Sequence, residues 1–141
     1  MAPPLRSRWR SHSTPGTGSV GASARLVVYP RAIGAGTVTA LLTFGLGAIV
    51  AVLAGRSVAV FNGFVVVGCL LGGFRAGLGY PPAPLANGAG AGAIAAIPLA
   101  IAGIVRGRHP VGAVFAVFLA ASLGMLGAMV AASSNRRRGV T

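Results

Sequence analysis

The sequence predicts an all-α polytopic membrane protein in which four transmembrane helices form a compact bundle packed through small residues. Three observations predict this fold. The 141 residues are 55% apolar and 9% charged, whereas soluble domains are typically about a quarter charged. The apolar residues are concentrated in four long segments, and the mean hydropathy is +0.82. Glycine occurs 23 times, and small residues allow helices to approach closely in lipid.

Four apolar segments lie between residues 33 and 132, and we expect each to cross the membrane. The predicted spans are 33–54, 57–78, 86–105 and 111–132. A helix of 22 residues is about 33 Å long at 1.5 Å per residue, enough to cross a hydrocarbon core of about 30 Å. The first run is longer than the h-region of a signal peptide, about 7 to 15 residues, so we expect this helix to be retained.

Short polar or proline-rich joints separate the predicted spans. Arg56 ends the first span, and "GYPPAP" ends the second because proline removes backbone donors. The third span contains Pro98, which a membrane helix tolerates as a kink, and whether this span crosses completely is left open. The stretch "AGRSVAVFNGF" resembles "RGRHPVGAVFAVF"; two tandem hairpins would explain this similarity, but chance explains it more readily in a sequence of so few residue types.

The arginines predict the orientation of the chain. We expect residues 1–32 to be a disordered basic tail and residues 133–141 to be a second basic tail, because both are polar and carry arginine. With four spans, the two tails hold eight arginines and Arg75 near the end of the second span adds a ninth on the same side, against three on the opposite side. The positive-inside rule therefore predicts that both termini are cytoplasmic. The use of arginine without lysine, with abundant Ala, Gly, Val and Pro, indicates a bacterium of high GC content and hence its inner (plasma) membrane.

Arg75 lies close to the end of the second span, where its guanidinium needs to climb only about 5 Å to reach the headgroups. The chain has no carboxylate side chain to neutralise it. We expect anionic lipid headgroups to serve as counterions for Arg75 and for Arg136, Arg137 and Arg138. The alternative is that Arg75 lines a cavity and binds an anionic substrate. Because the basic tail lies beside the membrane, we expect lipid rather than nucleic acid as its partner.

Small residues at four-residue spacing predict the helix contacts. The predicted packing residues are Gly68, Gly72, Gly73 and Gly77 in the second span, Gly88 and Gly92 in the third, and Gly124 in the fourth. The abundance of such residues also leaves open a homo-oligomer or a larger membrane complex.

The residues that catalysis or metal binding would need are missing from the sequence. Without Asp or Glu, the chain cannot form an acid–base pair of carboxylates, a carboxylate metal site or a Ser-His-Asp triad. His12 and His109 fall on opposite sides of the predicted membrane, and Cys69 is the single cysteine. We therefore expect no enzymatic activity, no cofactor and no metal, with Cys69 as a packing residue.

The motifs "GGFRAG" after the core of the second span and "PLANGAGAG" at the start of the third lie within residues 33–132. This pattern resembles small four-helix bacterial integral membrane proteins of unknown function, which implies a fold and a location but no activity. The chain is also similar to small multidrug exporters in length and number of spans. It lacks the glutamate that those exporters carry in their first membrane helix, which argues against proton-coupled drug antiport.

Two functional classes remain. The first is a structural or accessory subunit, because small-residue stripes supply contact surfaces and nothing supplies chemistry. The alternative is a small oligomeric channel or facilitator with a pore lined by Thr39, Thr43, Asn62 and Ser122.

Overall fold

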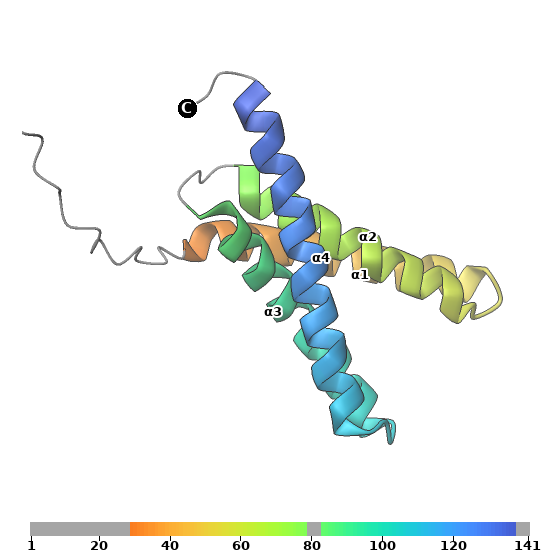
Figure 1. The fold of residues 1–141 in the computed structure, drawn as a ribbon. Coiled ribbons are helices and arrows are strands. Elements are labelled where there is room, and N and C mark those ends of the chain that lie inside the picture. Colours follow the sequence, from red (N-terminus) through yellow and green to blue (C-terminus); the bar gives the residue numbers. More distant parts are fainter. Residues whose placement is uncertain (1–28, 79–82, 138–141) are drawn as a thin grey trace, which may run out of the picture.

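The computed structural model describes residues 29–78 and 83–137, which form four helices and no strand. The helices are α1 (Pro30–Leu53), α2 (Val58–Leu78), α3 (Pro84–Val105) and α4 (Pro110–Arg137) (Figure 1). All four are long and apolar enough to cross a membrane. The predicted all-α, four-helix membrane fold is confirmed, and the third helix qualifies as a span although Pro98 lies inside it.

Proline sets the start of three helices. Pro30 and Pro84 occupy the first turns of α1 and α3, and α4 begins at Pro110. A proline at this position is favourable because its fixed φ suits a helix and its missing N–H has no partner there anyway. The remaining helix, α2, has no proline at its start. It follows Ser57, whose Oγ accepts a hydrogen bond from the N–H of Val60 at 3.4 Å.

The helix boundaries differ from the predicted spans mainly at the polar ends. The fourth helix continues past the predicted end at residue 132 to Arg137, so the first part of the predicted C-terminal tail is helical. Asn135 holds this extension, because its Nδ2 donates to the carbonyl oxygen of Leu78 at 3.0 Å. The first helix starts at Pro30, so residues 30–32 of the predicted N-terminal tail are also helical. The rest of the predicted tails, 1–28 and 138–141, lies outside the described residues.

Two short loops join the helices into hairpins, and both reverse the chain with a glycine of positive φ. Gly107 has φ +84°, and the N–H groups of Gly107 and Arg108 donate to the carbonyls of Ile104 and Gly103. This is the Schellman arrangement that commonly ends a helix at glycine. In the first loop Gly55 has φ +74° and is followed by Arg56 at φ +62°.

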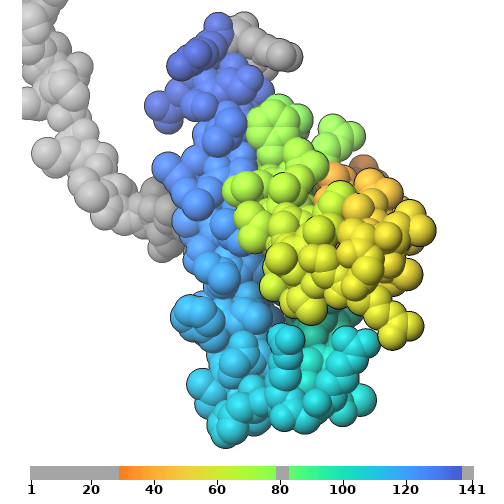
Figure 2. Space-filling view, turned by 90° about the vertical axis from the view of Figure 1, so that its right-hand side faces the viewer, coloured from red at the N-terminus to blue at the C-terminus, as the bar shows by residue number. Residues whose placement is uncertain are grey.

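The two hairpins, α1/α2 and α3/α4, cross each other steeply (Figure 1). The loop of the first hairpin lies at the right of Figure 1 and that of the second at the bottom, and Figure 2 views the molecule from the side of the first loop. We call the part of the molecule that contains the two loops, residues 54–57 and 106–109, the loop side. The opposite end, with Tyr29, Leu78, Ala83 and Arg137, is the termini side. Within the described residues, α1 and α4 do not contact each other, while every other pair of helices does.

Small residues fill the interior, and large apolar residues face outward. Apart from Phe44, Cys69 and Asn87, every buried residue of the four helices is alanine or glycine. Leu42, Leu53 and Phe118 are 71%, 81% and 69% exposed. This distribution is the reverse of that in a soluble protein. It suits a protein whose surroundings are lipid, where close backbone contact holds helices together.

Candidate functional site

The crossing of the two hairpins brings glycines of all four helices into contact. Gly36 of α1 meets Gly72 of α2, because a Cβ built on Gly36 would lie 2.5 Å from the carbonyl oxygen of Gly72. Gly73 of α2 lies directly against the carbonyl of Gly124 in α4. A Cβ on Gly88 of α3 would lie 2.5 Å from the same carbonyl oxygen. The backbones touch at this point, and we call these five residues, Gly36, Gly72, Gly73, Gly88 and Gly124, the glycine crossing.

The other predicted packing glycines lie along the arms that leave this crossing. Gly68 faces the ring of Phe44, Gly77 faces Ala128 and Ala131, and Gly92 lies against the carbonyl oxygen of Ala120. These three glycines therefore contact neighbouring helices of the same chain. Pairing with a second copy stays a prediction.

Each helix changes its partner on passing through the glycine crossing. On the loop side α1 packs on α2 at Gly47 and Phe64. On the termini side α1 instead packs on α3, where a Cβ on Gly90 would lie 3.1 Å from Ile33 Cδ1. In the same way α4 moves from α3 to α2, where a Cβ on Gly77 would lie 3.1 Å from Ala131 Cβ. The molecule therefore has two loop-side arms, α1/α2 and α3/α4, and two termini-side arms, α1/α3 and α2/α4.

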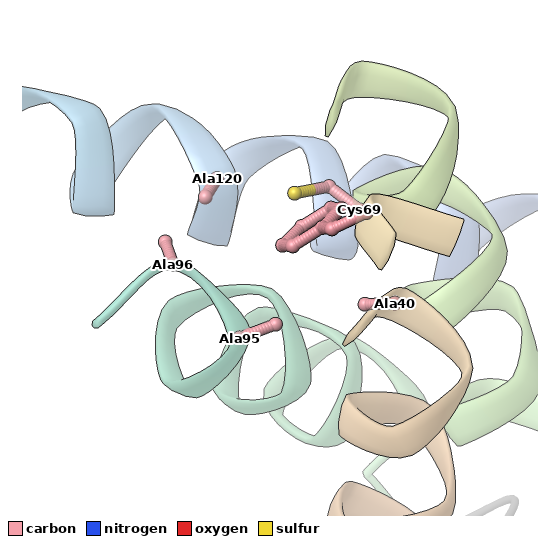
Figure 3. Close-up of a cluster of buried hydrophobic side chains, with 6 residues drawn as sticks. Ala40, Cys69, Ala95, Ala96 and Ala120 are labelled. Atoms are coloured by element: carbon pink, nitrogen blue, oxygen red, sulfur yellow. The ribbon is translucent and has the colours of Figure 1, made fainter. Parts of the chain in front are cut away.

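A small apolar cluster fills the space between the four helices beside the crossing. It contains Ala40, Phe44, Cys69, Ala95, Ala96 and Ala120, and its labelled side chains point into one common space (Figure 3). Cys69 is fully buried there as a free thiol. Its surroundings are apolar, and no acid, base or second cysteine lies among them. The site therefore offers packing rather than thiol chemistry.

Two amide side chains make hydrogen bonds between the hairpins. Asn87 is fully buried, and its Oδ1 accepts from the backbone N–H of Tyr29 at 3.1 Å. Its Nδ2 is buried without a hydrogen-bond partner. Asn135 makes the bond to Leu78 described above. Asn87 lies at the start of the third predicted span, whereas Asn135 lies beyond the predicted end of the fourth and was therefore missed by the sequence analysis.

The arginines predicted to contact anions lie at the surface of the termini side. Arg75 is exposed in the last turn of α2, and Arg136 and Arg137 are exposed in the last turn of α4. Positive charge is favourable at a helix C-terminus, where the backbone dipole is negative. Arg138 lies outside the described residues. Arg75 therefore faces outward, where headgroups would lie, rather than into a cavity between the helices.

The structure does not bring together the four residues considered for a pore. The hydroxyls of Thr39, Thr43 and Ser122 each donate to a backbone carbonyl one turn earlier in their own helix, at 2.9 Å. Asn62 is exposed on α2. Ser122 is exposed on α4, while Thr39 and Thr43 lie one turn apart on α1, and the backbones of α1 and α4 do not approach closely within the described residues.

A shallow hollow on the surface of α1, near the first loop, is lined by apolar side chains. It has a volume of about 340 Å³ and is lined by Ala48, Ile49, Val52 and Leu53 of α1. No group of three metal-ligating side chains gathers anywhere in the residues that the structure describes.

Comparison of the chain with protein-family models, with curated proteins and with solved structures found no match. The resemblance to small four-helix bacterial membrane proteins therefore stays a prediction. The four apolar helices define the class of the protein, which is a multi-pass integral membrane protein.

Proposed function

We propose that the chain is a non-enzymatic structural or accessory subunit of a membrane assembly. The observation that carries this proposal is the inverted distribution of side-chain size. The interior of the described residues is filled by alanine and glycine, with Phe44, Cys69 and Asn87 as the exceptions, while large apolar side chains cover the outside. Such a molecule offers its outer faces to lipid and to the helices of other membrane proteins.

The absence of acidic residues from the whole sequence supports a role without catalysis. With no Asp or Glu, a reaction that needs a carboxylate would depend on a partner to supply it. The hydroxyls of Thr39, Thr43 and Ser122 hydrogen-bond their own helices, which leaves these three groups occupied rather than poised toward a substrate.

The proposed setting is the inner membrane of a bacterium, with both termini in the cytoplasm. Nine arginines on the termini side, counted over the whole sequence, against three on the loop side support this orientation. Arg75, Arg136 and Arg137 are exposed in last turns at that end, and anionic headgroups are their nearest counterions in this setting.

Affinity capture tests the accessory role. The full-length tagged chain is captured from gently solubilised native membranes, with untagged membranes as the control. We expect a defined membrane protein to co-purify in a fixed ratio that is unchanged between two mild detergents. Recovery of the chain alone under both conditions would contradict an accessory subunit.

The alternative, a channel or facilitator, would require several copies to surround a pore, because its four candidate polar residues do not meet within one chain. Ion flux into vesicles that contain the purified protein separates the two functions. The accessory role predicts flux equal to that of protein-free vesicles. Flux above this level that falls in a Ser122→Leu variant would favour the channel.

A further inference from the structure

The two amide hydrogen bonds between the hairpins described above lie on the same side of the molecule. The Asn87–Tyr29 bond joins the beginnings of α3 and α1, and the Asn135–Leu78 bond joins the ends of α4 and α2. Each bond therefore closes one termini-side arm. Each also connects the second hairpin, which supplies the amide, to the first hairpin, which supplies the backbone group.

The loop-side arms have no such connection between hairpins. The two loops lie far apart in Figure 1, and Val58, Val105 and Val111 beside them are 64%, 80% and 69% exposed. Next to the glycine crossing, the apolar cluster around Phe44, Cys69 and Ala120 also joins the two hairpins, and the hydrogen bonds between the hairpins described above lie on the termini side. The separation of the loops is thus set by the angle at which the hairpins cross.

The glycine crossing has the properties of a pivot. Its contacts are between backbones and methyl groups, such as Gly73 against Gly124 and Gly36 against Gly72. The larger side chains of Phe44, Leu99 and Leu123 pack in the neighbouring apolar cluster. In membrane proteins, helix pairs commonly cross at about +20°, and pairs packed through glycine commonly cross at about −40°. The two amide bonds add contacts at the far ends of the termini-side arms, where they oppose a change of the crossing angle.

We propose that the two hairpins form a hinged pair, in which the amides of Asn87 and Asn135 on the termini side hold the loop-side arms apart. Rotation about the glycine crossing toward a shallower angle would separate α1 from α3 and α2 from α4 on the termini side. It would therefore break both amide bonds and bring the loops together. The device has an open state with both bonds made and a closed state with both broken.

Asn87 uses one of its two polar atoms for a hydrogen bond, which makes its bond to Tyr29 the easier one to break in the proposed movement. A buried polar group without a partner is unfavourable, and Nδ2 of Asn87 is such a group. Movement of this amide to the membrane surface would give Nδ2 a water or headgroup partner, which offsets part of the loss of the bond to Tyr29. A residue that served only as a static tie would be expected to satisfy both of its polar atoms.

Distance measurements between the loops test the hinge. Spin labels are placed at Ala54→Cys and Arg108→Cys in a Cys69→Ala background, and the full chain is reconstituted in phospholipid vesicles. We expect a long, narrow distance distribution when both asparagines are present. In the Asn87→Leu/Asn135→Leu double variant the distribution should shift to shorter distances and broaden, and each single variant should show a partial shift.

Matched controls separate a hinge from general damage. Asn62→Leu removes an exposed amide that makes no hydrogen bond within the described residues, and it should leave the loop-to-loop distance unchanged. Labels within the first hairpin, at Leu42→Cys and Val58→Cys, should report the same distance in every variant. A change there equal to the change between the loops would overturn the proposal, because the amides would then hold individual hairpins together.

An unchanged loop-to-loop distance in the double variant would also overturn the hinge. Should the buried Asn87→Leu substitution prevent folding, as judged by helical circular dichroism, the decision rests on Asn135→Leu alone. Asn135 is only half-buried at the end of α4, and a loop-to-loop distance unaffected by this variant rejects the proposal.

Discussion

Glycines of the same helix have different roles in this protein. The role of each glycine depends on whether another helix lies against it. A Cβ on Gly73 would coincide with the backbone of Gly124, whereas a Cβ on Gly63 would meet no atom within 4 Å. Both residues lie in α2. The sequence identified Gly73 through its spacing to Gly77, and the structure shows the helix that this spacing brings close.

A substitution at the crossing should therefore destabilise the protein. We expect Gly73→Ala to lower the free energy of unfolding by about 1–3 kcal/mol, because the added methyl group forces α2 and α4 apart. The measurement is reversible unfolding in mixed detergent micelles. Gly63→Ala is the matched control and should be neutral or stabilising by up to about 1 kcal/mol, since alanine favours a helix where space is open. Equal effects of the two variants would contradict the contact at Gly73.

The asparagines show that the amino-acid type alone does not predict which residue forms a hydrogen bond between helices. Asn87 and Asn62 are both amides within a few residues of a predicted span end. Asn87 is fully buried against Tyr29, while Asn62 is exposed. The difference comes from the crossing, which brings the start of α1 beside the start of α3.

At the scale of the element, the length of the apolar segments predicted that four helices exist, but it predicted the positions of the helix ends less well. A hydropathy pattern marks where the chain is apolar, but a helix continues for as long as its backbone hydrogen bonds and side-chain contacts support it. The fourth helix therefore extends through Ser133, Ser134 and Asn135 to Arg137. The contact that holds it, Asn135 to Leu78, joins residues far apart in the sequence and left no local signal.

The hairpin loops depend on glycine at positive φ. We expect Gly107→Ala to lower the free energy of unfolding by about 1–2 kcal/mol, because a Cβ is strained in the left-handed region. The same unfolding measurement applies. Gly112→Ala, at a nearby glycine with open space around it and no positive φ, serves as the control. A loss of stability at Gly112 as large as that at Gly107 would rule out backbone strain as the cause.

At the scale of the whole molecule, four candidate spans bring the two described ends, Tyr29 and Arg137, to one side of a membrane. Four spans give this result whatever the orientation in the membrane, and the arginines predict that this side is cytoplasmic. The crossing also reduces the contact between the hairpins to a short region, because crossed helices touch over fewer turns than aligned helices. This arrangement leaves the loop-side arms exposed to their surroundings.

Topology reporters test this arrangement in cells. We expect reporters fused to the N-terminus and the C-terminus to be cytoplasmic, and single cysteines at Ala54 and Arg108 to react with a membrane-impermeant reagent from outside, in a Cys69→Ala background. The positive-inside rule is the physical reason. Cys69 alone, buried in the core, is the unreactive control. Reporters on opposite faces would refute four complete spans.

The sequence by itself determined that the chain belongs in a membrane, that it has four helices, and that small residues hold them together. These properties follow from the length of the apolar segments and the spacing of residues within single helices, which are local quantities. The tertiary structure alone decided which helices meet, where they exchange partners and which amides join them. Those contacts link residues more than fifty positions apart, and in a sequence so rich in glycine and alanine many pairings satisfy the same spacing. The way in which the two hairpins cross determines which of these possible helix pairings is formed.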